Sequence, residues 1–223
     1  MNILAIPCNT QNYGGLRGQK VEYIVMHFTA NNGDTARDNG SYFKNNRVGA
    51  SAHWFVDETE AVLSVEEQFV AWHCGGAVYR HPACRNGNSI GVELCSEKDA
   101  NGEYFFNEAT VENAKQLVRQ LMTKYNVPVE RVLRHYDVTG KVCPAPFVGV
   151  GKAAWEEFKG GLTMYQKLEN VPDWARSSIQ KLVERGILLG REEENLNLSG
   201  DLTRTLVILD RLGLFDQKED VHE

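Results

Sequence analysis

Two apolar segments limit the folds that this chain of 223 residues can adopt. Residues 21–28 (VEYIVMHF) and 89–95 (SIGVELC) are rich in β-branched and aliphatic side chains. Strands buried on both faces have such runs, whereas half-exposed strands alternate apolar and polar residues. The two segments therefore predict central strands of a sheet that is covered on both sides, as in an α/β domain.

A candidate metal site begins at His27, near the C-terminal end of the first predicted strand, where α/β folds open their binding crevices. His135 and Cys143 lie eight residues apart in a segment, residues 131–147, that we expect to be irregular. Such a loop can bring both side chains to one ion. Two imidazoles and a thiolate suit Zn²⁺, and three protein ligands leave a fourth position for water, as in catalytic zinc sites. The pattern predicts one zinc ion per chain. Without His135 and Cys143, His27 alone would be interpreted as a buried core histidine at the end of a strand.

A second group of metal-binding residue types has a spacing that could hold a structural zinc. It consists of His73, Cys74, His81 and Cys84 and stays open as an alternative. The five cysteines, in a chain whose N-terminus lacks a basic segment and a long apolar stretch, favour reduced thiols over a disulfide framework. A disulfide between Cys74 and Cys84, formed after the protein leaves the cell, also stays open as an alternative.

The remaining elements are predicted from periodicity and turn residues. In chain order they are a loop over residues 31–40, a short helix around 41–45, a hairpin formed by 53–56 and 61–65, a loop over 77–88, an amphipathic helix over 108–125 and a short helix over 153–158.

The segments that carry these residues, VMHFTA, SIGVELC and LRHYDVTGKVCPAPF, resemble the type 2 N-acetylmuramoyl-L-alanine amidases. That family includes phage endolysins, bacterial autolysins and animal peptidoglycan recognition proteins. The resemblance covers roughly residues 21–158. It implies an α/β fold with a central mixed β-sheet flanked by helices. It also implies a zinc hydrolase that cleaves the amide bond between N-acetylmuramic acid and L-alanine in peptidoglycan.

The resemblance also assigns roles to residues near the ligands. Glu93 is the expected general acid and base, and Lys141 the expected cation for the oxyanion. Without the resemblance, Glu93 would be a solvent-facing strand residue and Lys141 a surface lysine. Trp72, His73 and His53 are expected to bind substrate, although His53 fits equally well as support behind the ligands or as a packed strand residue. Ala52 stands where some relatives have a tyrosine, so no phenol can act there.

Two classes of function follow. The leading one is an enzyme, a phage or prophage endolysin, with a bacterial autolysin of the same chemistry as the alternative. The other is a non-catalytic peptidoglycan-binding module, which in such relatives commonly lacks the thiol ligand that Cys143 supplies here. The N-terminus predicts cytoplasmic synthesis without a signal peptide and action on the cell wall after release. The net charge of −6 argues against nucleic acid as a partner, and no apolar run approaches the roughly 20 residues that span a membrane.

The C-terminal part predicts a separate module. Lys159, Gly160 and Gly161 indicate a boundary, giving a catalytic domain over residues 1–161 and an all-α module over 162–223. Two amphipathic helices, ending near Gly186 and Gly213, resemble a single S-layer-homology-like repeat. Residues 164–223 carry 8 basic and 12 acidic side chains, a net charge of −4. We therefore expect this module to bind a wall polymer, or a second copy of itself, through hydrogen bonds and apolar contacts.

Overall fold

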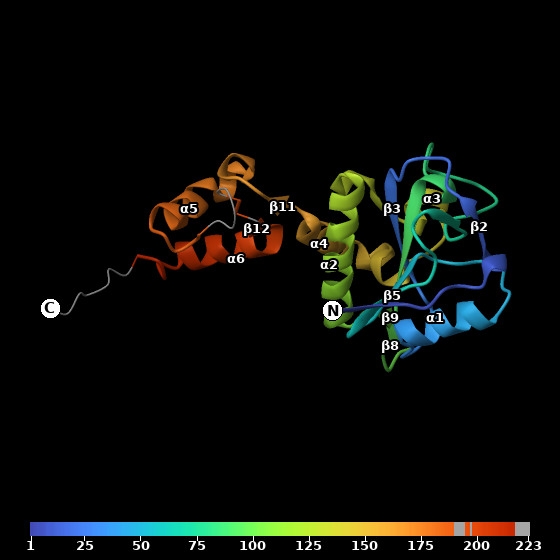
Figure 1. Cartoon of the computed structure of the whole chain (residues 1–223). Coiled ribbons are helices and arrows are strands. Elements are labelled where there is room, and N and C mark those ends of the chain that lie inside the picture. Colours follow the sequence, from blue (N-terminus) through green and yellow to red (C-terminus); the bar gives the residue numbers. More distant parts are fainter. Residues whose placement is uncertain (190–194, 197, 217–223) are drawn as a thin grey trace. The chain divides into compact units, whose positions relative to one another are not determined.

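The computed structural model describes residues 1–189, 195–196 and 198–216, and the chain divides into two compact units, Met1–Phe158 and Lys159–Glu223 (Figure 1). The strands of the first unit are β1 (Asn2–Ala5), β2 (Tyr13–Leu16), β3 (Tyr23–Phe28), β4 (Trp54–Val56), β5 (Glu60–Leu63), β6 (Phe69–Ala71), β7 (Ser89–Leu94), β8 (Glu97–Lys98), β9 (Tyr104–Phe105) and β10 (Val132–Arg134). Its helices are α1 (Ala36–Asn45), α2 (Glu108–Tyr125), α3 (His135–Thr139) and α4 (Lys152–Leu162), the last continuing into the second unit. Short 3-10 helices are η1 (Thr10–Asn12), η2 (Asn86–Asn88), η3 (Val129–Arg131), η4 (Ala145–Phe147), η5 (Gly149–Gly151) and, in the second unit, η6 (Leu168–Asn170).

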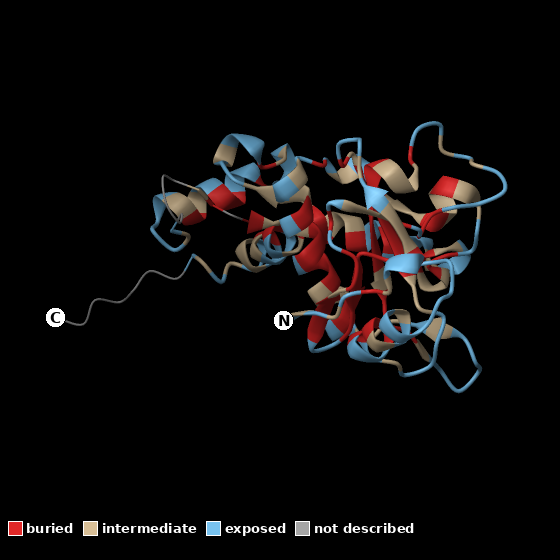
Figure 2. Cartoon of the chain, turned by 45° about the vertical axis from the view of Figure 1, so that its right-hand side comes forward, coloured by how far each residue is buried: buried red, intermediate tan, exposed pale blue. Residues whose placement is uncertain are grey.

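A six-stranded sheet with the order β1-β5-β4-β7-β3-β10 forms the centre of the first unit. Strands β4, β7, β3 and β10 run parallel, β5 is antiparallel to β4, and β1 is parallel to β5. The predicted mixed sheet flanked by helices is confirmed. The two segments predicted as central strands are β3 and β7, which pair with each other and are largely buried (Figure 2). The predicted hairpin is β4 and β5.

The two faces of the sheet carry different helices. Phe55 of β4 packs with Phe43 of α1 at a ring-centroid distance of 5.2 Å. The neighbouring Trp54 points to the other face, where its Nε1 donates a hydrogen bond to Glu67. Tyr125, the last residue of α2, donates to the same carboxylate. Because side chains alternate along a strand, α1 and α2 cover opposite faces.

Helix α2 has the predicted bounds, and local signals explain both ends. The Asn107 side chain accepts a hydrogen bond from the Ala109 N–H, and Asn126 adopts the left-handed conformation that ends a helix. Helix α1 begins at Ala36, so the predicted loop over residues 31–40 is wrong in its second half. Thr35 and Asp38 form a reciprocal capping box that starts the helix inside this polar stretch.

The expectation that residues 131–147 are irregular is wrong in part. The segment contains β10, which extends the sheet beside β3, and α3, which begins at His135. The start of α3 is fixed by Asp137, which accepts hydrogen bonds from the backbone and guanidinium of Arg134. A three-residue strand and a five-residue helix are too short to produce a recognisable hydrophobic period.

The second unit contains β11 (Met164–Tyr165), α5 (Asp173–Glu184), β12 (Leu198–Ser199) and α6 (Gly200–Arg211). Both predicted helices are present and pack through a buried cluster that includes Ile179, Leu182 and Val207. The expectation of an all-α module needs correction, because β11 and β12 form an antiparallel pair. The predicted boundary at residues 159–161 lies within α4.

Parts of the predicted C-terminal module, residues 190–194, 197 and 217–223, lie outside the described residues. Trp174, near the start of α5, is 47% exposed and does not belong to the buried cluster of this unit. In the part of the chain that the structure describes, no helix combines the length and apolar character needed to cross a membrane.

Candidate metal centre

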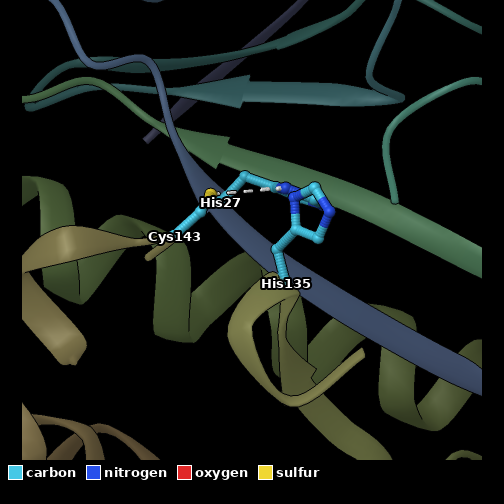
Figure 3. Close-up of side chains that lie close together, drawn as sticks. All are labelled: His27, His135 and Cys143. Carbon is cyan, nitrogen blue, oxygen red and sulfur yellow. Dashed lines mark hydrogen bonds between the residues drawn. The ribbon is translucent and has the colours of Figure 1, made fainter. Parts of the chain in front are cut away.

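His27, His135 and Cys143 come together in the first unit, as predicted. All three are buried, and their potential ligand atoms lie within 4.8 Å of one another (Figure 3). The Nδ1 atom of His27 is 3.6 Å from Cys143 Sγ, and the two imidazole rings have a centroid distance of 4.8 Å. These residues come from β3, from the start of α3 and from the loop after α3.

The backbone explains how residues so far apart in sequence meet. Strand β10 pairs with β3 so that Arg134 lies opposite Met26, which places His135 next to His27. Helix α3 then ends at Gly140, whose φ of +87° is accessible to glycine without strain. The chain turns back, and the Tyr136 N–H donates a hydrogen bond of 2.8 Å to the Cys143 carbonyl. This turn brings the thiol to the two imidazoles.

The donor set fits Zn²⁺. Both ring nitrogens of His135 are buried, and among the described residues neither has a hydrogen-bond partner. Because buried polar atoms are normally hydrogen-bonded, this histidine has a place for a ligand that the protein itself does not fill. Burial lowers the pKa of His135 to about 4 and that of His27 well below its usual value, so both are neutral, the form that binds metals.

The Cys143 thiol also calls for a cation. Burial, with repulsion from Glu93, raises the pKa of Cys143 to about 12. A thiolate at this position therefore needs a positive charge beside it, and a divalent cation supplies one.

Glu93 and Lys141 border the cluster. Glu93 pairs with His27 across β7 and β3, so the two side chains leave the same face of the sheet. Its Oε2 atom is shielded from solvent and has no hydrogen-bond partner in the described part of the chain. Burial raises the pKa of Glu93 to about 8, against an opposing effect of Lys141. The Lys141 side chain is exposed, and its charge also helps to lower the pKa of His135.

The residues expected to bind substrate are placed differently from one another. Trp72 is 38% exposed and remains a candidate for a substrate contact. His53 and His73, by contrast, are buried. The Nδ1 atom of His73 lies 3.0 Å from His27 Nε2, and His53 Nδ1 accepts a hydrogen bond from the Gly91 N–H. His73 therefore lies behind His27, and the His53 ring lies beside that of His73.

The alternative metal site, formed by His73, Cys74, His81 and Cys84, is not assembled in the structure. Its His81 Nδ1 accepts hydrogen bonds from the backbone N–H groups of Ala83 and Cys84. The Cys74 thiol donates to Asn86 Oδ1 at 3.2 Å. Across the described ranges, the group of His27, His135 and Cys143 is the one with metal-binding geometry. All five cysteines are free thiols.

Three further residues contribute to the site and were not predicted. Ser89 Oγ lies 3.2 Å from His73 Nε2, and the His73 ring occupies the space where a side chain at Gly91 would begin. Arg17 donates hydrogen bonds to the carbonyls of Gly87 and Phe69 on neighbouring segments. Gly91 had a signal in the sequence, because a glycine inside a buried strand often marks a close approach of another group.

Comparisons with known proteins agree with this geometry. A family model described as N-acetylmuramoyl-L-alanine amidase matches residues 17–146. The N-acetylmuramoyl-L-alanine amidase BlyA of Bacillus subtilis is 40% identical over 156 residues, which cover 64% of this chain and 41% of the relative. The amidase CwlL of Bacillus licheniformis is 38% identical over 154 residues, with the same two coverages. The chain thus matches about two fifths of the length of these relatives.

Solved structures show the same fold. An endolysin mutant from Bacillus subtilis superimposes with a TM-score of 0.60 at 29% identity, covering 73% of this chain and 99% of that chain. The catalytic domain of XlyA gives a TM-score of 0.60 at 27% identity, covering 73% of this chain and all of the other.

Proposed function

Because the chain belongs to the N-acetylmuramoyl-L-alanine amidase family, we propose that it hydrolyses the amide bond between N-acetylmuramic acid and L-alanine in peptidoglycan, with one Zn²⁺ per chain. The observation that carries this proposal is the buried cluster of His27, His135 and Cys143, in which the ring nitrogens of His135 have no protein partner. The holding atoms are His27 Nδ1, one ring nitrogen of His135 and Cys143 Sγ. A bound Zn²⁺ supplies Lewis acidity, which polarises a carbonyl and lowers the pKa of water toward about 7.

Glu93 is the proposed proton carrier. An amide is a poor electrophile with a poor leaving group, so hydrolysis needs a proton removed from water and one delivered to the nitrogen. The unpartnered Glu93 Oε2 can do both, taking the proton of the attacking water and returning it to the nitrogen as the C–N bond breaks. A pKa near 8 suits this task, because general acid–base catalysis is most effective near the working pH.

Lys141 is the proposed stabiliser of the oxyanion. Its ammonium group is the positive charge that most opposes the raised pKa of Glu93. A cation in that position also favours the negative charge that develops on the carbonyl oxygen during attack, an effect that typically contributes on the order of 10²–10³-fold in rate.

The proposed setting is lysis of the bacterial cell wall, as an endolysin or an autolysin. The similarity to an endolysin structure supports the first and the similarity to the Bacillus amidases is compatible with both. We assign catalysis to the first unit, since it contains all the proposed site residues. For the second unit we propose contact with a wall polymer or with another copy of the chain.

Digestion of purified peptidoglycan, followed by mass analysis of the products, tests the reaction. We expect free stem peptides with new L-alanine amino termini. New reducing sugars would instead indicate glycosidase activity and contradict the proposal. Binding without any release of product would favour the non-catalytic class.

A further inference from the structure

We propose that His73 is a positioning residue that fixes His27 in the tautomer needed for metal binding, and that Ser89 and Gly91 hold His73 in place. The inference rests on the proposed zinc chemistry and concerns the residues behind the ligands. His27 presents Nδ1 toward Cys143 Sγ, as Figure 3 shows, and therefore presents Nε2 in the opposite direction. His73 Nδ1 lies 3.0 Å from that Nε2, so the contact is a hydrogen bond between two imidazoles.

The direction of this hydrogen bond follows from the group at the far end of the chain of contacts. The Ser89 hydroxyl donates to the backbone carbonyl of Arg85 at 2.7 Å, and a carbonyl can only accept. With its proton so directed, Ser89 Oγ offers a lone pair to His73 Nε2 at 3.2 Å. His73 then carries its proton on Nε2, and its Nδ1 can only accept.

The consequence reaches His27. An accepting His73 Nδ1 requires the proton of neutral His27 to be on Nε2, which leaves the lone pair on Nδ1, the atom that faces Cys143. The opposite tautomer would put a proton on Nδ1 and two lone pairs face to face at 3.0 Å. Histidine ligands commonly have such an outer partner, which fixes their tautomer and ring orientation.

Gly91 makes room for His73. A Cβ atom at position 91 would lie 2.5 Å from His73 Cγ and 2.7 Å from its Nδ1, distances that real Cβ atoms do not show. Any side chain there would push the ring away from His27. Next to it, His53 accepts a hydrogen bond from the Gly91 N–H and stands at a ring-centroid distance of 5.6 Å from His73. The His73 ring is thus enclosed between strand β7 and two other imidazoles.

The experiment compares the zinc affinity of full-length variants by competition with a chromophoric chelator. His73→Leu removes the acceptor and should weaken zinc binding by about 10–100-fold, the usual effect of losing an outer partner of a metal ligand. His73→Asn keeps an acceptor oxygen near the position of Nδ1 and should restore most of the affinity. Equal losses in the two variants would overturn the proposed role, since a role in packing does not depend on the acceptor.

Ser89→Ala tests the far end of the chain, with Ser64→Ala as its matched control. Both serines are buried, but Ser64 Oγ has no hydrogen-bond partner within the described residues. Ser89→Ala should lower zinc affinity by about 10-fold, and Ser64→Ala should leave it unchanged. Nitrogen NMR of the zinc-loaded protein should find the protons of His27 and His73 on Nε2. A proton on Nδ1 of His73 would refute the assignment.

Gly91→Ala provides an independent test through non-additivity. Alone it should cost as much zinc affinity as His73→Leu, because the ring is displaced. In a His73→Ala background the added methyl group meets no ring and should cost little more. Gly40→Ala is the control, since its Cβ would clash with Val62 Cγ1 at 2.9 Å, away from the ligands. It should reduce thermal stability and leave zinc affinity unchanged.

The outcomes separate this inference from the proposed function. If the unmodified protein binds no zinc, both are wrong. If it binds zinc and cleaves the amide while His73→Leu keeps the same affinity, the function stands and the positioning role is refuted.

Discussion

Replacing Glu93 by Gln should stabilise the metal-free protein while removing most of its activity. The carboxylate is shielded on one oxygen, has no hydrogen-bond partner there in the described part of the chain, and has its pKa raised to about 8 from 4.5. A neutral amide of the same shape avoids the cost of burying that charge. Turnover should fall about 10²-fold or more, because the amide cannot carry a proton.

The pH dependence gives the sign and size of the stability effect. Below pH 4.5 the carboxyl is protonated in both the folded and the unfolded chain. Between pH 4.5 and about 8 the carboxyl of the unfolded chain ionises while that of the folded chain stays protonated. The free energy of unfolding therefore falls as the pH rises through this range. At about 1.4 kcal/mol per pKa unit, the full loss is about 5 kcal/mol. Relaxation of the protein around the charged carboxylate, and the nearby charge of Lys141, make the real loss of stability smaller. We expect about 1–3 kcal/mol.

Urea unfolding of chelator-treated protein, measured at pH 5 and at pH 8.5, tests this prediction. The advantage of Glu93→Gln in free energy of unfolding should be small at pH 5, grow at pH 8.5 and shrink again with bound Zn²⁺, because the cation favours the ionised carboxylate. Glu58→Gln is the control, as an exposed glutamate that should change stability by no more than about 0.5 kcal/mol. A variant that is less stable than the unmodified protein at pH 8.5 would refute the reasoning.

Three further results are expected. Chelation should abolish activity, and added Zn²⁺ should restore it. Cys143→Ser should weaken zinc binding by more than about 100-fold, a larger loss than the removal of any outer partner of a ligand causes. Full zinc occupancy of that variant would exclude the site. Lys141→Ala should bind zinc normally and lose on the order of 10²-fold in kcat, and an unchanged kcat would remove it from the mechanism. A chain ending after Thr163, which keeps the whole of α4, should cleave soluble muropeptides at nearly the full rate but lose binding to intact cells; equal losses on both would mean that the C-terminal unit supports the fold of the first.

The sequence was sufficient to predict those features whose signal lies within one continuous segment. Strands β3 and β7 and helix α2 follow from runs and periods within single segments, and the three candidate ligands follow from residue type, spacing and resemblance. It was insufficient where a role depends on a contact between distant segments. His73 lies 46 residues from His27, and only the fold places its Nδ1 on His27 Nε2. Its neighbour Trp72 is exposed whereas His73 is buried, a difference that no pattern in the sequence indicates.

Strand β7 connects these features through the two-residue period of a β-strand. Ser89, Gly91 and Glu93 leave one face and pair with Tyr23, Val25 and His27 of β3. On that face Ser89 ends the hydrogen-bond chain, Gly91 admits the His73 ring and Glu93 stands beside His27, the proposed metal ligand.

The residues between them, Ile90, Val92 and Leu94, are fully buried on the face that α2 covers. A register shift of one residue would exchange the two sets, placing aliphatic side chains at the candidate metal centre and a serine and a glutamate in the core. The same packing that holds α2 on the sheet therefore keeps Ser89, Gly91 and Glu93 on the face that carries the candidate site.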